Sequence, residues 1–387
     1  MPFREIQGQA AAVSVLQRMV ARARVPGALL FLGPPHVGKR TAALALAQAL
    51  NCERLPAGAG GPAVPAERAE PETPGPDACG ACPSCRKIEA GAHPDVETVA
   101  PDGQFIKIDQ IRAVGDRLGL NPLQARRRFI VLAQAERMNL PAANAFLKTL
   151  EEPPADTTLV LCASEGALLP ETIVSRCLPV RFAPLTEPVL RALLQAQAEA
   201  ASPKRGRAAS AEAALPEPVL DFAVRFAQGS LRPELKDQAA AWHALREDLL
   251  AALNELPAGG DLLGERLTRF SAKDTVAFVL EWLETWWRDV AVLAAGGAAE
   301  HLINADRRDA LAPWLERLSL RQAQACYRRV LSTRDAMTVN VNATLALEGL
   351  WLGFKHTLHE AAAGPARPDA GGRPDGGSRP ASTRRSP

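Results

Sequence analysis

The segment 33–41 carries residue types that bind phosphate. It reads Gly-Pro-Pro-His-Val-Gly-Lys-Arg-Thr, follows an apolar run at 29–32, and leads into a run typical of a helix. Gly33 and Gly38 would let backbone N–H groups converge on a phosphate at the start of that helix, and Lys39 would reach the terminal phosphates. The spacing therefore predicts a P-loop that once bound a nucleotide.

Two departures from the P-loop pattern argue against hydrolysis. The residue after the lysine should be Ser or Thr to bind magnesium, but it is Arg40, and Thr41 comes one position late, about 100° round the helix. A hydrolase also needs an acid where a neighbouring strand ends, and that place holds Ala133 and Gln134. Glu136 is the nearest acid, and we expect it to be a solvated residue. We therefore expect no intrinsic ATPase activity, while binding of ATP or ADP stays open.

Four cysteines have the spacing of a metal site. Cys79, Cys82 and Cys85 form two successive C-x-x-C spacings, and Cys52 stands at the end of the run that follows the phosphate loop. Four thiolates are the ligand set of a closed, tetrahedral zinc site, which leaves no position for a catalytic water. We predict structural Zn²⁺ at these four residues. The other three cysteines lie in apolar or helical runs and are expected in the core.

A parallel sheet is needed to position the phosphate loop. Short apolar runs at 29–32, 129–133 and 158–163 are bounded by turn residues, as buried parallel strands are, and the helical runs between them would be the crossovers. After about residue 186 the pattern is helical, with an amphipathic helix at 275–293. The sequence predicts an α/β domain followed by helical domains.

Composition limits the classes of protein that fit. A chain of 387 residues is long enough for two or three domains. No apolar run approaches the roughly 18 residues needed to cross a bilayer, and the N-terminus has no signal-peptide core, so we expect a cytoplasmic protein. The formal charge is +2, and the segment 361–387 alone carries five Arg against two Asp, which leaves the remainder near −1. That balance argues against a broadly basic DNA-coating surface.

Several motifs in a fixed order carry a family resemblance. Besides the P-loop and the cysteines, they are Ile6-Gln-Gly-Gln9, His93-Pro-Asp95, Asn144-Ala-Phe-Leu-Lys-Thr-Leu-Glu-Glu-Pro-Pro154 and Ser175-Arg-Cys177. In this order they resemble the bacterial clamp-loader AAA+ proteins of DNA polymerase III. The resemblance covers residues 1–235 well and extends more weakly through Asn340-Val-Asn342 and Leu345-Ala-Leu-Glu348.

The resemblance implies a division of the chain into domains. We expect an α/β AAA+ (P-loop, RecA-like) domain at 1–183 with a zinc module at 52–85, a small helical lid at 184–237, an all-α collar at 238–362 and a disordered tail at 363–387. Low-complexity stretches rich in Ala, Pro and Gly interrupt these domains at 55–77 and 200–218. They are expected to be a disordered and a flexible insertion.

The resemblance also implies roles for three residues outside the phosphate loop. Arg176 matches the arginine finger that such subunits project into the ATP site of a neighbour, and an arginine suits this because its fork binds two phosphate oxygens. The alternative is an arginine that caps a helix or pairs on the surface. Ser164 falls where a polar nucleotide sensor is expected, and Arg232 matches a second sensor in the lid.

Together, the resemblance and the two departures from the P-loop pattern imply a non-hydrolysing stator subunit of the clamp-loader complex. Its partners would be the gamma/tau ATPase subunits and the delta subunit, with the sliding clamp and primer-template DNA reached through the complex, at the replisome in the cytoplasm. Two alternatives stay open. One is an active ATPase motor subunit of the same complex, which the absence of the strand-end acids disfavours. The other is a zinc-dependent nucleic-acid-binding protein, which is disfavoured because the residues before 361 are together nearly neutral.

Overall fold

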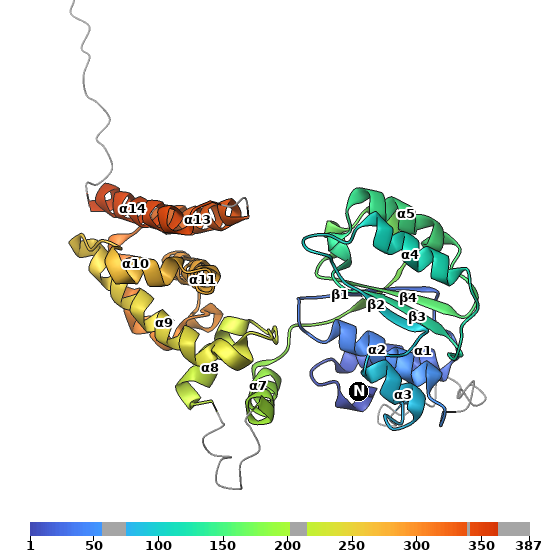
Figure 1. Ribbon diagram of the computed structural model, residues 1–387. Helices are drawn as coiled ribbons and strands as arrows, with labels where there is room; N and C mark the ends of the chain where they lie inside the picture. The colour runs from blue at the N-terminus through green and yellow to red at the C-terminus, as the bar shows by residue number, and fades with distance from the viewer. Residues whose placement is uncertain (56–74, 202–214, 339–340, 363–387) are drawn as a thin grey trace, which may run out of the picture. The chain divides into compact units, whose positions relative to one another are not determined.

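The chain folds into two compact units, Met1–His243 and Ala244–Pro387 (Figure 1). The computed structural model describes residues 1–55, 75–201, 215–338 and 341–362. The predicted insertions at 55–77 and 200–218, the residue Asn340 and the predicted tail at 363–387 fall wholly or largely outside these ranges. The finer division into an AAA+ domain, a lid and a collar stays a prediction.

Unit 1 contains a five-stranded parallel sheet in the order β2-β3-β4-β1-β5. The strands are β1 (Ala28–Leu32), β2 (Val96–Val99), β3 (Arg128–Leu132), β4 (Thr157–Ala163) and β5 (Leu178–Arg181). The predicted strands β1, β3 and β4 are confirmed and form the centre of the sheet. The two edge strands were not predicted from the sequence, because Glu97 and Thr98 interrupt the apolar pattern of β2 and only Val180 is buried in β5.

Helices cover both faces of this sheet, which explains the unbroken apolar runs in its central strands. In Figure 1, α1, α2 and α3 lie on one face, and α4 and α5 lie on the other. Successive side chains of β1 alternate between the two faces. Leu29 and Phe31 pack in the core beneath α1 and α2, whereas Leu30 packs in the core beneath α4 and α5.

The helices of unit 1 connect the strands and then continue beyond the sheet. They are α1 (Ala10–Ala21), α2 (Lys39–Asn51), α3 (Pro83–Glu89), α4 (Ile108–Leu118), α5 (Leu140–Glu151), α6 (Glu171–Val174), α7 (Glu187–Ala201) and α8 (Glu217–Ala227), with 3₁₀ turns η1 (Phe3–Glu5), η3 (Ala135–Arg137) and η4 (Gly166–Leu168). The helix α9 (Leu235–Glu255) begins in unit 1 and continues into unit 2.

Unit 2 is helical over its described residues. Its remaining elements are α10 (Gly264–Ser271), α11 (Val276–Ala294), α12 (Arg308–Arg317), α13 (Leu320–Met337) and α14 (Ala343–Ala362), with 3₁₀ turns η5 (Leu256–Ala258), η6 (Ala299–His301) and η7 (Ala305–Arg307). The predicted helix at 275–293 is confirmed as α11. Its buried Trp287 packs against Trp314 of α12 and Phe354 of α14. No helix among the described residues is long and apolar enough to cross a membrane. The predicted fold class, an α/β P-loop domain followed by helical regions, is confirmed.

A buried carboxylate fixes the loop that leads into β3. Asp95, which precedes β2, accepts hydrogen bonds of 2.8, 2.7 and 2.8 Å from the backbone N–H groups of Leu123, Gln124 and Ala125. It also pairs with the buried guanidinium of Arg128 at 3.4 Å. Burial acts to raise the pKa of Asp95, but the three backbone donors and Arg128 outweigh burial and lower the pKa. The folded chain therefore favours the charged carboxylate.

We expect Asp95→Asn to lower the free energy of unfolding by about 3 kcal/mol at pH 7, because it removes the charge that compensates a buried arginine. Since the folded pKa of Asp95 lies below its unfolded value of about 3.9, this stabilisation is present above the unfolded pKa and is lost as pH falls through the folded pKa. Urea unfolding of both proteins should therefore show a difference that shrinks below about pH 4.

Asp102→Asn is the matched control for this measurement. Asp102 also has a lowered pKa, through the hydrogen bond from Lys107, but this pair is exposed. Exposed ion pairs contribute little to stability, so this variant should unfold close to the wild type. An Asp95→Asn protein as stable as Asp102→Asn at pH 7 would contradict the anchoring role.

Candidate functional site

The phosphate loop joins β1 to α2 and contains three residues with a positive φ. Gly38 caps the N-terminus of α2 with φ 98° and ψ 14°, and His36 also has a positive φ of 56°. Gly33 has φ 150°, and a Cβ atom added there would lie 2.2 Å from the backbone oxygen of Phe182, just after β5. The two glycines therefore have different roles. Gly38 permits the turn into the helix, and Gly33 permits close packing of the loop on the sheet.

Lys39 is turned onto the loop itself. Its ammonium group donates hydrogen bonds to the backbone oxygens of Gly33 and Pro34, and the residue is only 8% exposed. Burial lowers the pKa of Lys39, and the nearby Cys162 and Glu136 act in the opposite direction. The loop carbonyls thus hold the cation that a P-loop offers to phosphate.

A cavity of about 590 Å³ lies beside this loop. Because the sheet is parallel, the segments after β1, β3 and β4 meet at one edge, and all three contribute to the cavity wall. Residues of unit 1 that line it include Ile6, Gln7, Gly38, Lys39, Arg40, Thr41, Ala133, Gln134, Glu136, Cys162, Ser164, Leu185, Leu193, Leu231 and Pro233. A volume of this size is ordinary for a small-molecule site.

The structure brings together most of the predicted nucleotide-binding residues. Gly38, Lys39, Thr41 and Ser164 line the cavity. Arg232 belongs to a different environment, with its guanidinium 5.3 Å from the centre of the Phe226 ring. The neighbours of Arg232 on both sides, Leu231 and Pro233, do line the cavity. The predicted second sensor is therefore next to the cavity without being part of its wall.

The prediction that Glu136 is solvated is wrong. Gln134, with φ 54°, turns the chain at the end of β3, and the 3₁₀ turn η3 carries Glu136 back to the cavity. One carboxylate oxygen, Oε1, accepts hydrogen bonds from the backbone N–H and the hydroxyl of Ser164, at 3.3 and 2.9 Å. The other, Oε2, is buried and has no hydrogen-bond partner among the described residues. No sequence pattern signalled this, since the result depends on one left-handed residue.

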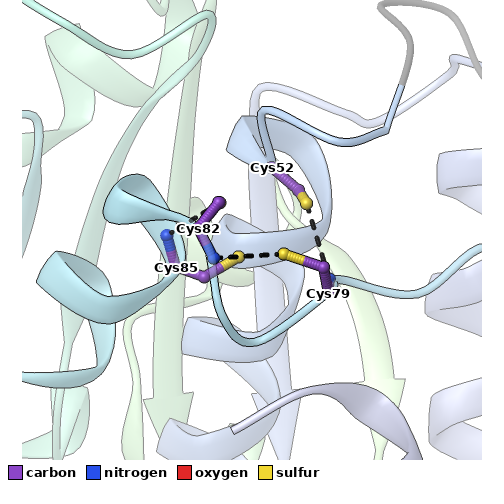
Figure 2. Close-up of side chains that lie close together, drawn as sticks. All are labelled: Cys52, Cys79, Cys82 and Cys85. Carbon is purple, nitrogen blue, oxygen red and sulfur yellow. Dashed lines mark hydrogen bonds between the residues drawn. The ribbon is translucent and has the colours of Figure 1, made fainter.

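The four predicted cysteines converge on one point (Figure 2). Their sulfur atoms all lie within 4.8 Å of one another, and each of the residues except Cys79 is buried. Cys52 follows the last residue of α2, and Cys82 caps the start of α3. The cluster thus joins the far end of the phosphate-loop helix to the segment 79–85.

Backbone N–H groups point at the sulfur atoms of Cys79 and Cys52, and at Cys79 they favour the thiolate over the thiol. Burial acts the other way at Cys85 and raises the pKa of that thiol. Cys79 Sγ accepts from Ala81 at 3.4 Å and from Cys82 at 3.2 Å. Cys52 Sγ accepts from the N–H of Cys79 at 3.4 Å. The backbone N–H of Ala81 is the largest influence that lowers the pKa of Cys79, to about 6. Four converging sulfur donors with this support fit a tetrahedral zinc ion.

Arg176 follows α6 and is about one-third exposed. It donates to the backbone oxygen of Thr172 at 2.8 Å and pairs with Glu151 of α5 at 2.7 Å. Within the described chain it does not line the cavity beside Lys39. These contacts match the alternative reading of a helix cap and surface pair, so the arginine finger stays a proposal.

Comparison with known proteins gives the family. A family profile described as "DNA polymerase III, delta subunit" matches residues 8–186, and one described as "DNA polymerase III, delta subunit, C terminal" matches residues 240–356. DNA polymerase III subunit delta' of Escherichia coli (strain K12) is 30% identical over 292 residues, covering 74% of this chain and 81% of the relative. The chain belongs to the DNA polymerase III delta-prime subunit family. The family predicted from the motifs is thereby confirmed.

Two further relatives match over part of the chain. DNA polymerase III subunit delta' of Bacillus subtilis (strain 168) is 36% identical over 173 residues, 45% of this chain and 47% of the relative. DNA polymerase III subunit tau of Escherichia coli (strain K12) is 30% identical over 242 residues, 62% of this chain and 33% of the relative. The chain therefore spans about half the length of the Bacillus delta-prime relative.

We expect Gly33→Ala to lower the free energy of unfolding by roughly 1–3 kcal/mol, because the new Cβ meets a backbone oxygen that side-chain motion cannot relieve. Gly115→Ala is the control: it lies inside α4, and a Cβ there meets nothing within 4 Å. Since alanine is the better helix former, this control should equal or exceed the wild type in stability. Equal denaturation midpoints for the two variants would refute the packing role of Gly33.

Proposed function

We propose that this delta-prime family member is the non-hydrolysing stator subunit of a bacterial clamp loader, and that it supplies Arg176 to ATP bound by a neighbouring subunit. The observation that carries the proposal is a contrast within unit 1. The cavity beside the phosphate loop has Ala133 and Gln134 where magnesium-binding acids are needed, and Arg40 where a hydroxyl is needed. Arg176, by contrast, lies outside that cavity and is accessible to a partner.

The cavity residues support the absence of hydrolysis in this subunit. Hydrolysis requires a magnesium ion and a group that orients the attacking water. Alanine offers no donor atom, and Glu136 accepts hydrogen bonds from Ser164 with one oxygen while the other is buried. Ala133 therefore cannot replace the missing strand-end acids. Glu136 could do so only if the turn η3 rearranged.

The present contacts of Arg176 would allow its guanidinium to exchange them for contacts with a phosphate group. A guanidinium has five N–H donors, and only a few of them are engaged by Thr172 and Glu151. Exposed ion pairs contribute about 0–1 kcal/mol, so the charged oxygens of a γ-phosphate can displace Glu151 at little cost. Bound there, the guanidinium would stabilise the negative charge that builds up as the phosphoryl group transfers.

Proposed partners follow from this chemistry. The subunit that provides the ATP would be a gamma/tau ATPase, in a complex with the delta subunit, acting in the cytoplasm at the replisome. Support comes from the similarity of this chain to curated proteins named DNA polymerase III subunits tau and gamma, at 30% identity. Through this complex the chain would contribute to placing the sliding clamp on primer-template DNA.

We further propose that Cys52, Cys79, Cys82 and Cys85 bind one structural Zn²⁺ ion. The support is the convergence of the four sulfur atoms and the backbone N–H groups directed at them. When bound, the ion would hold the end of α2 against α3. No substrate position remains in a site with four protein ligands.

Reconstitution with gamma/tau and delta tests the finger. We expect Arg176→Ala to assemble normally but to lower the DNA-stimulated rate of ATP hydrolysis at least severalfold, because a finger contributes about 10³–10⁵ at the site it serves. Arg176→Lys should fail similarly, since lysine lacks the planar fork. Arg18→Ala is the control, because Arg18 is also exposed and donates to the carbonyl four residues before it. A wild-type rate in the assembled Arg176→Ala complex would refute the proposal.

Metal analysis tests the zinc site. Protein purified without chelator should contain one zinc ion per chain. Cys85→Ala should lose the metal and unfold at a lower temperature, because metal binding at such a site contributes to folding. Cys326→Ala removes an equally buried thiol outside the cluster and should keep the metal. Wild-type protein without zinc, or Cys85→Ala protein with a full complement, would contradict the assignment.

A further inference from the structure

The loop 119–125, between α4 and β3, presents two leucines to solvent. Leu120 is 68% exposed and Leu123 is 78% exposed, the highest values among the large hydrophobic residues that the structure describes. None of the seven residues of this loop is buried, so the loop contributes no side chain to the core. Single exposed leucines are ordinary on a protein surface, but the backbone of this loop is held by buried charges.

Two buried charged side chains fix the backbone conformation of the loop. Asp95 accepts hydrogen bonds from three backbone N–H groups, one of which is that of Leu123 at 2.8 Å. Arg128 donates to three backbone oxygens at the other end of the loop, one of which is that of Leu120 at 2.9 Å. Burying such an ion pair is costly. Here the pair secures no core side chain and instead holds the backbone of two exposed leucines in place.

A loop held in this way is suited to bind another protein. Leu120 and Leu123 are three residues apart, so their Cα atoms are separated by at most about 11 Å and one partner surface can contact both. Because the backbone of the loop is already ordered in the free chain, binding does not carry the entropic cost of ordering it. Preorganised apolar side chains of this kind are typical anchors of a protein interface.

The charges beside the loop indicate the charge of the partner. The segment 117–128 contains no acidic residue. Lys87 donates to the Gln124 side chain of the loop at 2.9 Å, and both Lys87 and Arg126 are exposed. The two cations line a small pocket of about 90 Å³ together with one acid, Glu53, so positive charge is in excess there. An apolar pocket bordered by acidic side chains would complement both the leucines and these cations.

We propose that the loop 119–125 is a docking loop that places Leu120 and Leu123 in an apolar pocket, bordered by acidic side chains, on another protein of the clamp-loader assembly. The identity of the assembly rests on the proposed function. DNA does not suit the loop, because bases stack on aromatic side chains and phosphates bind cations, and the segment 119–125 contains neither. Two leucines bury little surface, so the contact is weak and reversible.

Binding of the full-length chain to purified gamma/tau, delta and sliding clamp, each measured separately, tests the proposal. We expect the double variant Leu120→Ser, Leu123→Ser to bind one of these proteins about tenfold more weakly or worse, because both anchors are lost. Lys87→Glu and higher salt should weaken the same complex, because each reduces the charge attraction. Leu140→Ser is the matched control and should bind normally, since Leu140, at the start of α5, is 67% exposed and lies outside the loop.

Wild-type affinity of the double variant for all three proteins overturns the proposal, and so does an equal loss in Leu140→Ser. A double variant that binds the proteins normally but loses affinity for primer-template DNA, or loses self-association, also overturns it. Circular dichroism checks the fold, and Leu123→Ala repeats the test if the double variant misfolds. A wild type that binds none of the three proteins contradicts the proposed function as well. The Arg176 test measures ATP hydrolysis in the assembled complex, so either proposal can fail while the other holds.

Discussion

The parallel direction of the central strands is the constraint on which the site depends. Strands β1, β3 and β4 all end at the same edge, so the phosphate loop, the turn η3 and Ser164 must share one cavity. This arrangement needs Gly33, because the loop leaves β1 too close to the backbone after β5 for any side chain. The other end of α2 is fixed as well, since Asn51 exchanges hydrogen bonds with the backbone of Arg127 before β3, and Cys52 joins the cysteine cluster.

The sequence predicted the centre of this arrangement well, because strong local signals encode it. Apolar runs predict β1, β3 and β4, and the spacing of Cys79, Cys82 and Cys85 predicts the convergence seen in the structure. The edge strands β2 and β5 were missed because an edge strand is buried on fewer sides and its apolar pattern is weaker. Their existence follows from pairing with β3 and β1, which is a long-range effect.

The position of Glu136 could not be predicted for a related reason. Its distance from β3 along the chain suggested a solvated turn, but one left-handed residue at Gln134 reverses the chain and returns the carboxylate to the cavity. A single backbone conformation therefore changes the chemistry of the site. The missing acids at Ala133 and Gln134 were evident from residue type, whereas the acid that is present depended on tertiary structure. Arg176 differs from Glu136 because its proposed role was inferred from the sequence and is not visible in the isolated chain. Its contacts there are those of a surface pair, and its proposed partner is on another subunit.

A structure of the assembled complex, with ADP and a γ-phosphate transition-state mimic bound to the neighbouring ATPase subunit, would test the role of Arg176 most directly. We predict that the guanidinium of Arg176 leaves Glu151 and lies within hydrogen-bond distance, about 2.7–2.9 Å, of the mimic. If Arg176 stays paired with Glu151 and no residue of this chain contacts the mimic, Arg176 is not an arginine finger.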